Sequence, residues 1–163
     1  MSDSTPHIPE GYHSVTPYLI VKGAAKAIEF YADIFGATEE MRLEMPGGVI
    51  GHAEIRIGDS KIMLGDECPQ MQALSPETVG GTPVGICLYV ADVDAVFEKA
   101  LASGVKVHKP VADQFYGDRS GTFFDPFGHM WTVATRKETL TVEEIRQRAA
   151  AMMQTGDHKN CDN

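Results

Sequence analysis

The feature that most constrains this fold is an internal repeat. The second half of the chain is similar in sequence to the first half at a constant shift of 69 positions. The matched positions are Leu19 with Leu88, Val21 with Val90, Glu29 with Glu98, and residues 62–64 (Ile-Met-Leu) with 131–133 (Trp-Thr-Val). The order of predicted elements also repeats between the halves. The sequence therefore predicts two copies of one module rather than a single irregular domain.

Each half has the pattern of a strand, a helix and three further strands. In the first half, apolar residues recur at helical spacing over 24–35, and Gly36 is placed to end that helix. In the second half, Asp92 is a suitable N-cap for a helix that Gly104 closes. The expected strands are 15–21, 40–44, 51–57 and 61–64 in the first half, and 84–90, 105–107, 120–124 and 130–134 in the second.

The fold class is therefore α+β, with two tandem βαβββ modules that form a curved, cup-like mixed sheet, plus a C-terminal helix. A sheet with one helix buries only one face, so the other faces should form the concavity in which a ligand binds. The expected segments are a flexible arm (1–13), the first module (14–67), a linker (68–83), the second module (84–136), a helix with a capping box at Thr141 and Glu144 (141–154) and a flexible tail (155–163).

Charge and composition exclude several classes of partner. The formal net charge of -9 argues against a nucleic-acid partner, which needs a basic surface. No apolar run approaches the roughly 20 residues that span a bilayer, so no membrane partner is expected. The three cysteines lack paired spacing, and the N-terminus lacks a secretory signal. A cytoplasmic location is the simplest interpretation.

Several short motifs resemble those of the vicinal oxygen chelate superfamily, which includes glyoxalase I, bleomycin-resistance proteins, fosfomycin-resistance enzymes and extradiol dioxygenases. The module repeat and the turn at 125–131 (Asp-Pro-Phe-Gly-His-Met-Trp) resemble the superfamily as a whole. Details closer to its PhnB-like branch are 15–19 (Val-Thr-Pro-Tyr-Leu), 52–55 (His-Ala-Glu-Ile), 116–119 (Tyr-Gly-Asp-Arg), 134–136 (Ala-Thr-Arg) and 142–144 (Val-Glu-Glu). The resemblance implies this fold and a homodimer, but it is weak for a particular reaction because the fold hosts both enzymes and binders.

The resemblance also implies where a metal would be bound. In metal-dependent members, four side chains, usually His or Glu, converge from the first and last strands of the modules. The corresponding positions here are Thr16, Met63, Gly85 and Thr132, none of which is a good ligand for a divalent ion. We therefore expect neither the metal site of the family nor any other cofactor.

The predicted strand 51–57 carries the strongest candidates for chemistry. His52, Glu54 and Arg56 share one face, while the apolar residues at 53, 55 and 57 should pack on the helix. His52 and Glu54 could form hydrogen bonds, act as acid and base, or hold a relocated metal ion. The charge of Arg56 disfavours the metal, and a purely structural ion pair of Glu54 with Arg56 or a neighbour is a further alternative.

Other candidates lie outside that strand. Arg119 could clamp an anionic group of a ligand, or it could pair with Asp118. His129 is expected to be structural. The candidate ligand-contacting residues are Tyr18, Arg56, Met63, Tyr89, Phe115, Tyr116, Arg119, Met130 and Thr132.

These observations favour a homodimeric, metal-free protein that binds a small organic molecule. The alternative is a lyase or isomerase with Glu54 or His52 as general base and Arg119 as the anchor of the substrate.

Overall fold

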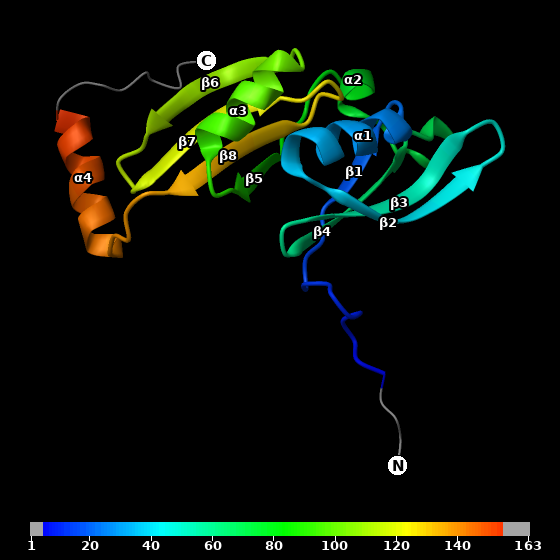
Figure 1. Cartoon of the computed structure of the whole chain (residues 1–163), viewed down its shortest axis with the longest axis horizontal. Coiled ribbons are helices and arrows are strands. Elements are labelled where there is room, and N and C mark those ends of the chain that lie inside the picture. The colour runs from blue at the N-terminus through cyan, green and yellow to red at the C-terminus, as the bar shows by residue number, and fades with distance from the viewer. Residues whose placement is uncertain (1–4, 155–163) are drawn as a thin grey trace. The chain divides into compact units, whose positions relative to one another are not determined.

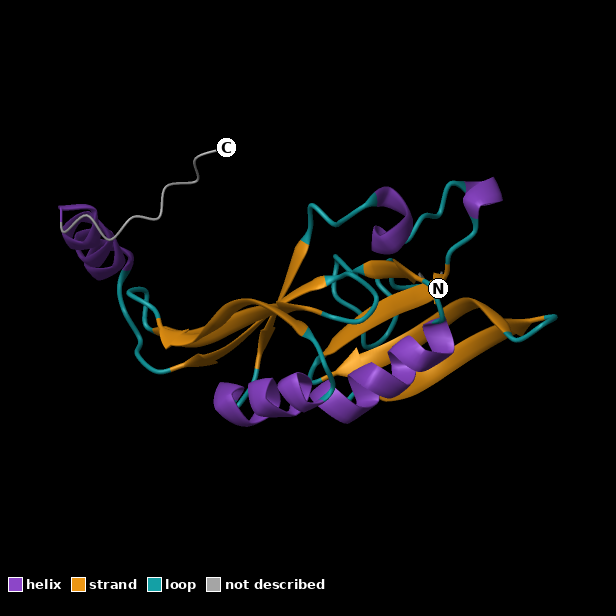
Figure 2. Cartoon of the chain, turned by 90° about the horizontal axis from the view of Figure 1, so that it is seen from above, coloured by secondary structure: helices purple, strands orange, loops and turns teal. Residues whose placement is uncertain are grey.

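The computed structural model describes residues 5–154, and the chain divides into two compact units (Figures 1 and 2). The first unit contains the residues up to Val84 together with Asp125–His129. The second contains Gly85–Phe124 and the residues from Met130 onwards. Each unit holds one four-stranded sheet. The predicted fold class is confirmed: the chain is α+β, with two mixed sheets of βαβββ modules and a C-terminal helix.

The first unit has the strand order β1-β4-β3-β2, in which β1 runs parallel to β4 and the other pairs are antiparallel. Its elements are β1 (Tyr18–Val21), α1 (Ala24–Phe35), β2 (Thr38–Met45), β3 (Val49–Ile57), β4 (Ser60–Asp66), the 3-10 helix η1 (Pro69–Met71) and α2 (Pro76–Val79). The predicted linker thus contains two short helices.

The second unit repeats this topology with the order β5-β8-β7-β6, and β5 runs parallel to β8. Its elements are β5 (Gly85–Tyr89), α3 (Val93–Ala102), β6 (Lys106–Asp113), β7 (Asp118–Phe124), β8 (Met130–Arg136) and α4 (Val142–Gln154). Strands β6 and β7 both extend further than their sequence patterns indicated. The extension of β7 to Asp118 places Arg119 within a strand instead of a loop.

In each unit the helix between the first two strands covers one face of its own sheet. Helix α1 buries Ala27, Ile28 and Tyr31, and the facing strand β3 buries Ala53 and Ile55. The same arrangement recurs in the second unit, where a Cβ atom at Gly121 would lie 2.6 Å from the ring of Phe97 on α3. Each helix therefore leaves the opposite face of its sheet without a covering helix.

The turn predicted from residues 125–129 is tied to α1. The Tyr31 hydroxyl donates to the Asp125 carboxylate at 2.7 Å, and that carboxylate also accepts the backbone N–H groups of Phe127 and His129. The Nε2 atom of the His129 side chain lies 3.0 Å from the carbonyl oxygen of Ile20 on β1. This contact agrees with the structural role expected for His129.

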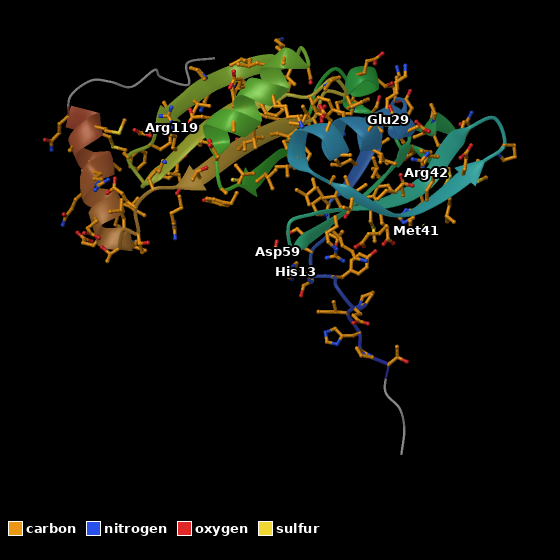
Figure 3. The ribbon with its side chains drawn as sticks, in the orientation of Figure 1. His13, Glu29, Met41, Arg42, Asp59 and Arg119 are labelled. Carbon is orange, nitrogen blue, oxygen red and sulfur yellow. The ribbon has the colours of Figure 1, made fainter. Side chains whose placement is uncertain are left out.

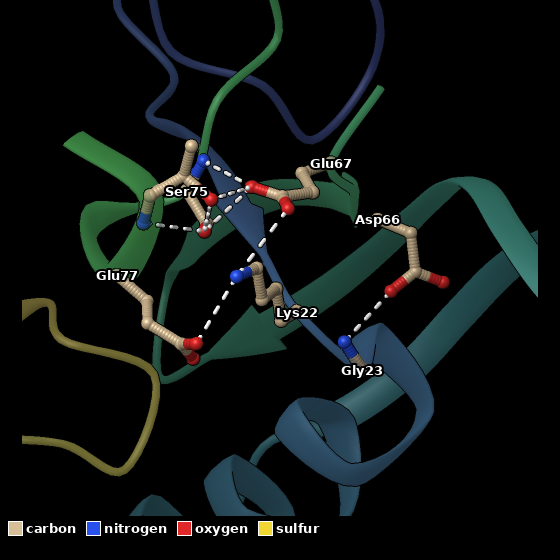
Figure 4. A network of polar contacts seen from close by, with 7 residues as sticks. Lys22, Gly23, Asp66, Glu67, Ser75 and Glu77 are labelled. Atoms are coloured by element: carbon tan, nitrogen blue, oxygen red, sulfur yellow. Dashed lines mark hydrogen bonds and ion pairs between the residues drawn. The ribbon is translucent and has the colours of Figure 1, made fainter. Parts of the chain in front are cut away.

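The N-cap residue of helix α1 is Gly23, which has no side chain to cap the helix, and Asp66 at the end of β4 supplies the cap. One oxygen of the Asp66 carboxylate accepts the N–H groups of Gly23 (Figure 4) and Ala24, both at 2.8 Å, and the other accepts the N–H of Ile50. One side chain therefore fixes the helix start against two strands.

Replacing Asp66 with Ala should lower the free energy of unfolding by roughly 2–3 kcal/mol, because three backbone N–H groups lose a charged acceptor. Chemical denaturation measures this loss. Asp59→Ala, in the β3–β4 turn, is the control, since among residues 5–154 the Asp59 carboxylate accepts only from the adjacent Ser60. Equal effects of the two substitutions would contradict the capping role of Asp66.

A second polar cluster ties α2 to Glu67, the residue that follows β4 (Figure 4). The Glu67 carboxylate accepts hydrogen bonds from the Ser75 backbone N–H, the Thr78 hydroxyl and the Ser75 hydroxyl, and Lys22 lies 3.6 Å away. These hydrogen bonds, led by that from the Ser75 backbone, lower the pKa of Glu67 from 4.5 to about 2.

The low pKa of Glu67 predicts a pH-dependent contribution to stability. A carboxylate whose pKa falls on folding stabilises the protein fully above about pH 4.5, and this stabilisation is lost as the pH falls towards 2. The melting temperature of Glu67→Gln should therefore lie below that of the unmodified protein by a constant margin above pH 5, and the margin should shrink below pH 4. Glu29→Gln, on the exposed side of α1, should show no such pH-dependent margin.

Candidate functional site

The face of the first sheet that lies opposite α1 carries the strongest sequence candidates. The side chains of His52, Glu54 and Arg56 lie on this face and are partly exposed, whereas Ala53 and Ile55 are fully buried beneath the helix. The alternation predicted for β3 is therefore confirmed. Cross-strand register adds Met63 of β4 beside Glu54.

Glu54 lies at the centre of a group of polar side chains on this face. Its carboxylate lies 3.5 Å from His52 Nε2 and 3.5 Å from Lys61 Nζ. Hydrogen bonding from Tyr12, with smaller contributions from His52 and Lys61, outweighs burial and lowers the pKa of Glu54. Glu54 is thus a fixed negative charge at neutral pH.

Arg56 is paired within the protein. Its Nε atom and Lys61 Nζ both donate to the carboxylate of Glu40, the latter at 2.8 Å. Lys61 and then Arg56 lower the pKa of Glu40. Arg56 therefore pairs with a neighbour, which is one of the alternatives left open by the sequence, and it does not pair with Glu54.

Tyr18 on β1 reaches across the sheet to His52 on β3. The two residues lie two strands apart, since β4 runs between β1 and β3. The Tyr18 oxygen lies 2.9 Å from His52 Nδ1, and the two ring centroids are 5.5 Å apart. The phenol passes over β4 at Gly65, where a Cβ atom would lie 3.4 Å from the phenol oxygen, an ordinary contact, but only 2.9 Å from the Gly51 carbonyl oxygen next to His52.

A cavity of about 500 Å³ opens beside Glu54. Its lining residues are His7, Ile8, Pro9, Tyr12, His13, Ser14, Thr16, Glu54 and Met63. Residues 7–14, most of them within the predicted flexible arm, therefore supply much of its wall. Tyr12 is held there by Lys61, whose ammonium lies 4.2 Å from the centroid of the Tyr12 ring, and by its hydrogen bond to Glu54.

Tyr12, Glu40 and Lys61 were missed by the sequence analysis. A signal existed for Lys61, which lies opposite Arg56 across a short turn. Glu40 was not foreseeable because a β-bulge between Glu39 and Met41 interrupts the register between β2 and β3.

The other predicted ligand-contacting residues lie in the second unit. The Tyr89 hydroxyl donates to Asp118 at 2.7 Å, and this hydrogen bond, with burial, raises the pKa of Tyr89 to about 12. The hydroxyls of Thr132 and Thr122 lie 2.9 Å apart. Phe115 and Tyr116 lie in the loop before β7 and pack edge-on against each other, and the Tyr116 hydroxyl lies 3.5 Å from Ser120 Oγ on β7.

Arg119 does not join these residues. Its guanidinium donates to both oxygens of Asp94 on α3, at 2.7 and 2.8 Å, and to Asp113 on β6 at 3.1 Å. Figure 3 labels Arg119 among the side chains of the second unit. The sequence suggested either a ligand anion or Asp118 as the partner of Arg119. The structure pairs Arg119 with Asp94 and Asp113 instead. The α3 side of the sheet carries Arg119, while Asp118 faces away from α3 towards Tyr89.

The four positions at which the fold family holds a metal ion do not suit one. Thr132 shares its hydroxyl with Thr122, and Met130 Cε lies 2.8 Å from the point that a Cβ atom at Gly85 would occupy. Thr16 and Met63 offer only a neutral hydroxyl and a thioether. Throughout residues 5–154, no group of three or more His, Cys, Asp or Glu side chains is arranged to hold an ion. Nor does any helix in that range have the length and apolar character needed to cross a membrane.

Comparison with known proteins adds a family and several relatives. The model of the Glyoxalase/Bleomycin resistance protein/Dioxygenase superfamily matches residues 11–133. The uncharacterized protein Rv0887c of Mycobacterium tuberculosis is 42% identical over 147 residues, which cover 88% of this chain and 85% of that protein.

Solved structures are similar in fold. Protein PA1353 from Pseudomonas aeruginosa has a TM-score of 0.64 and 25% identity, and the match covers 76% of this chain and 98% of that one. A PhnB protein from Bacillus cereus has a TM-score of 0.60 and 18% identity, with 76% and 99% covered. PhnB-like proteins are therefore among the structural neighbours, but the comparisons single out no branch.

The path of Tyr18 across Gly65 gives a testable prediction. Gly65→Ala should lower the free energy of unfolding by about 1–3 kcal/mol, because its Cβ meets the rigid Gly51 carbonyl, and it should displace Tyr18 from His52. Denaturant unfolding and the NMR contacts between the two rings measure these effects. Gly51→Ala is the matched control, since its Cβ would meet mainly the flexible side chain of Met45. An intact Tyr18–His52 contact in Gly65→Ala would contradict this description.

Proposed function

This chain belongs to the Glyoxalase/Bleomycin resistance protein/Dioxygenase superfamily, and from that premise we propose that it binds a small organic molecule, without a metal ion at the positions used by the family. The observation that carries the proposal is the cavity beside Glu54. Its volume of about 500 Å³ lies within the range of small-molecule sites. Its wall combines apolar surface, from Met63 and the Tyr12 ring, with one carboxylate.

The chemistry of the wall favours a ligand with a cationic or hydrogen-bond-donating group on an apolar body. Glu54 is ionised, and an ionised carboxylate only accepts hydrogen bonds. The Glu54 carboxylate lines the cavity, so a donor group of a ligand would meet an acceptor there. The thioether of Met63 and the neighbouring apolar surface can adapt to the body of the ligand.

A lyase or isomerase is the second candidate function. The lowered pKa of Glu54 disfavours Glu54 as the general base, because an effective base has a pKa near the working pH. Arg119 is committed to Asp94 and Asp113, so it does not favour substrate binding either. The contact between Tyr18 and His52 is the observation that keeps an enzymatic function under consideration. A metal ion at His52 and Glu54 would compete with the Lys61 ammonium, which disfavours that variant.

Three finer expectations also remain proposals: a homodimer, a cytoplasmic location and membership of the PhnB-like branch. The motifs at 116–119 and 134–136 support the branch, and helix α4, which buries none of its residues in the described part of the chain, offers a surface to a second copy. Sedimentation equilibrium of the full chain distinguishes a dimer from a monomer.

The binding proposal predicts a preference for amines over acids. We expect 2-phenylethylamine to raise the melting temperature, and phenylacetate, of similar size but opposite charge, to leave it unchanged. At an amine concentration of about ten times its Kd, the gain is about 1.4 kcal/mol, or roughly 3–6 °C for a chain of this size.

Glu54→Gln tests the anchor directly. It should weaken binding of the amine by about tenfold or more, since a charge-assisted hydrogen bond contributes about 1.5–3 kcal/mol, and calorimetry measures the change. Glu98→Gln, an exposed carboxylate on α3, is the control and should bind as the unmodified protein does. Equal affinity for amine and acid, or unchanged affinity in Glu54→Gln, would refute Glu54 as the anchor.

A further inference from the structure

His52 lies between a phenol and a carboxylate. Tyr18 Oη is 2.9 Å from Nδ1 and 3.5 Å from the Gly51 carbonyl oxygen, and Glu54 Oε1 is 3.5 Å from Nε2. An ionised carboxylate beside Nε2 favours the tautomer with its hydrogen on Nε2, and in that tautomer Nδ1 accepts from the Tyr18 phenol. The order of groups is therefore hydroxyl, imidazole, carboxylate.

Three strands of the first sheet hold these side chains in that order. Tyr18 comes from β1, His52 and Glu54 come from β3, and Gly65 on the intervening β4 leaves space for the phenol to cross. Tyr18 is the most exposed of the three residues, at 46%, whereas His52 and Glu54 are half-buried. The phenol is therefore open to a reacting molecule, and Glu54 is reached through the cavity that it lines.

The charges around Glu54 suit a carboxylate that stabilises a cation. Tyr12 and Lys61 contact Glu54 and keep it ionised, so it remains negative while the imidazole beside it gains a proton. Lys61 in turn is neutralised by Glu40, which also pairs with Arg56. Glu54 is therefore a positioning residue, and His52 is the base.

We propose that Tyr18 is a base-assisted tyrosine that exchanges a proton with a weakly acidic small molecule bound on this face of the first unit. The acidic proton of the ligand passes to the phenol oxygen, while the phenol proton passes to His52 Nδ1. The products are the ligand anion, a phenol that has exchanged its proton, and an imidazolium that faces the Glu54 carboxylate. Protons and charges balance without a metal ion or another reactant.

The proton loss from Tyr18 has to be coupled to His52. Burial raises the pKa of the Tyr18 phenol, so free phenolate is not the reactive form at neutral pH. In this relay of Tyr18, His52 and Glu54, an imidazole oriented by a carboxylate activates a hydroxyl, as in the known Ser-His-Asp arrangement. The relay rests on the proposed function in one respect, which is that a ligand must bind on this face.

Benzenesulfonyl fluoride tests the relay without a natural ligand. The phenol oxygen attacks sulfur, an S–O bond forms, the S–F bond breaks, fluoride leaves, and the phenol proton passes to His52. Peptide mapping by mass spectrometry gives the labelling rate at each tyrosine. Tyr89 is the internal control, since it is more exposed, at 58%, and donates to a carboxylate instead of an imidazole. We expect Tyr18 to react at least about tenfold faster than Tyr89.

Variants separate chemistry from folding. His52→Ala should reduce the labelling rate of Tyr18 to about that of Tyr89 and leave the labelling rate of Tyr89 unchanged. Added imidazole should restore the labelling rate of Tyr18. If the circular dichroism spectrum of His52→Ala shows that this variant is unfolded, His52→Gln is used in its place. Glu54→Gln should slow Tyr18 labelling less than the loss of His52 does.

Labelling of Tyr18 no faster than that of Tyr89, or a rate independent of His52 and of added imidazole, would overturn the proposal. If 2-phenylethylamine does not bind but Tyr18 stays reactive, only the proposed binding function is refuted. The two proposals can therefore fail separately.

Discussion

A four-stranded sheet covered by one helix can bury only one of its faces, and this constraint shapes both units of the chain. In the first unit α1 takes the apolar side chains of β3, which leaves His52, Glu54 and Arg56 on the opposite face. Polar groups gathered there must pair with one another or with solvent. The pairing of Glu54 with Tyr12, His52 and Lys61 keeps one carboxylate ionised beside a cavity, and the functional proposals follow from that charge.

The sequence was sufficient for the repeat, the element order and the two faces of β3, because each depends on local periodicity. The placement of Arg119 was not foreseeable in this way. The orientation of the Arg119 side chain depends on whether Arg119 belongs to β7. The sequence pattern predicted that this strand starts at Ser120, whereas it starts two residues earlier, at Asp118. The partner on α3, Asp94, is 25 residues away in sequence. Long-range ion pairs of this kind leave no periodic signal.

The same limit applies to the candidate site. His52 and Glu54 could be found from alternation along one strand, but the Tyr18–His52 contact requires the strand order β1-β4-β3 and a glycine at position 65. Tyr12 lies in a segment without regular secondary structure, so only its contacts with Glu54 and Lys61 assign it to the site. Binding and proton transfer also use Glu54 differently: as an anchor for a donor group in one case, and as the partner of an imidazolium in the other.

The most direct test of the central claim, that ionised Glu54 anchors a ligand without a metal ion, is an NMR titration of the chelator-treated protein with 2-phenylethylamine. The account predicts chemical shift changes concentrated at Thr16, Glu54 and Met63, around the cavity. Changes that arise only after a divalent ion is added, or that leave these three residues unaffected, would contradict it.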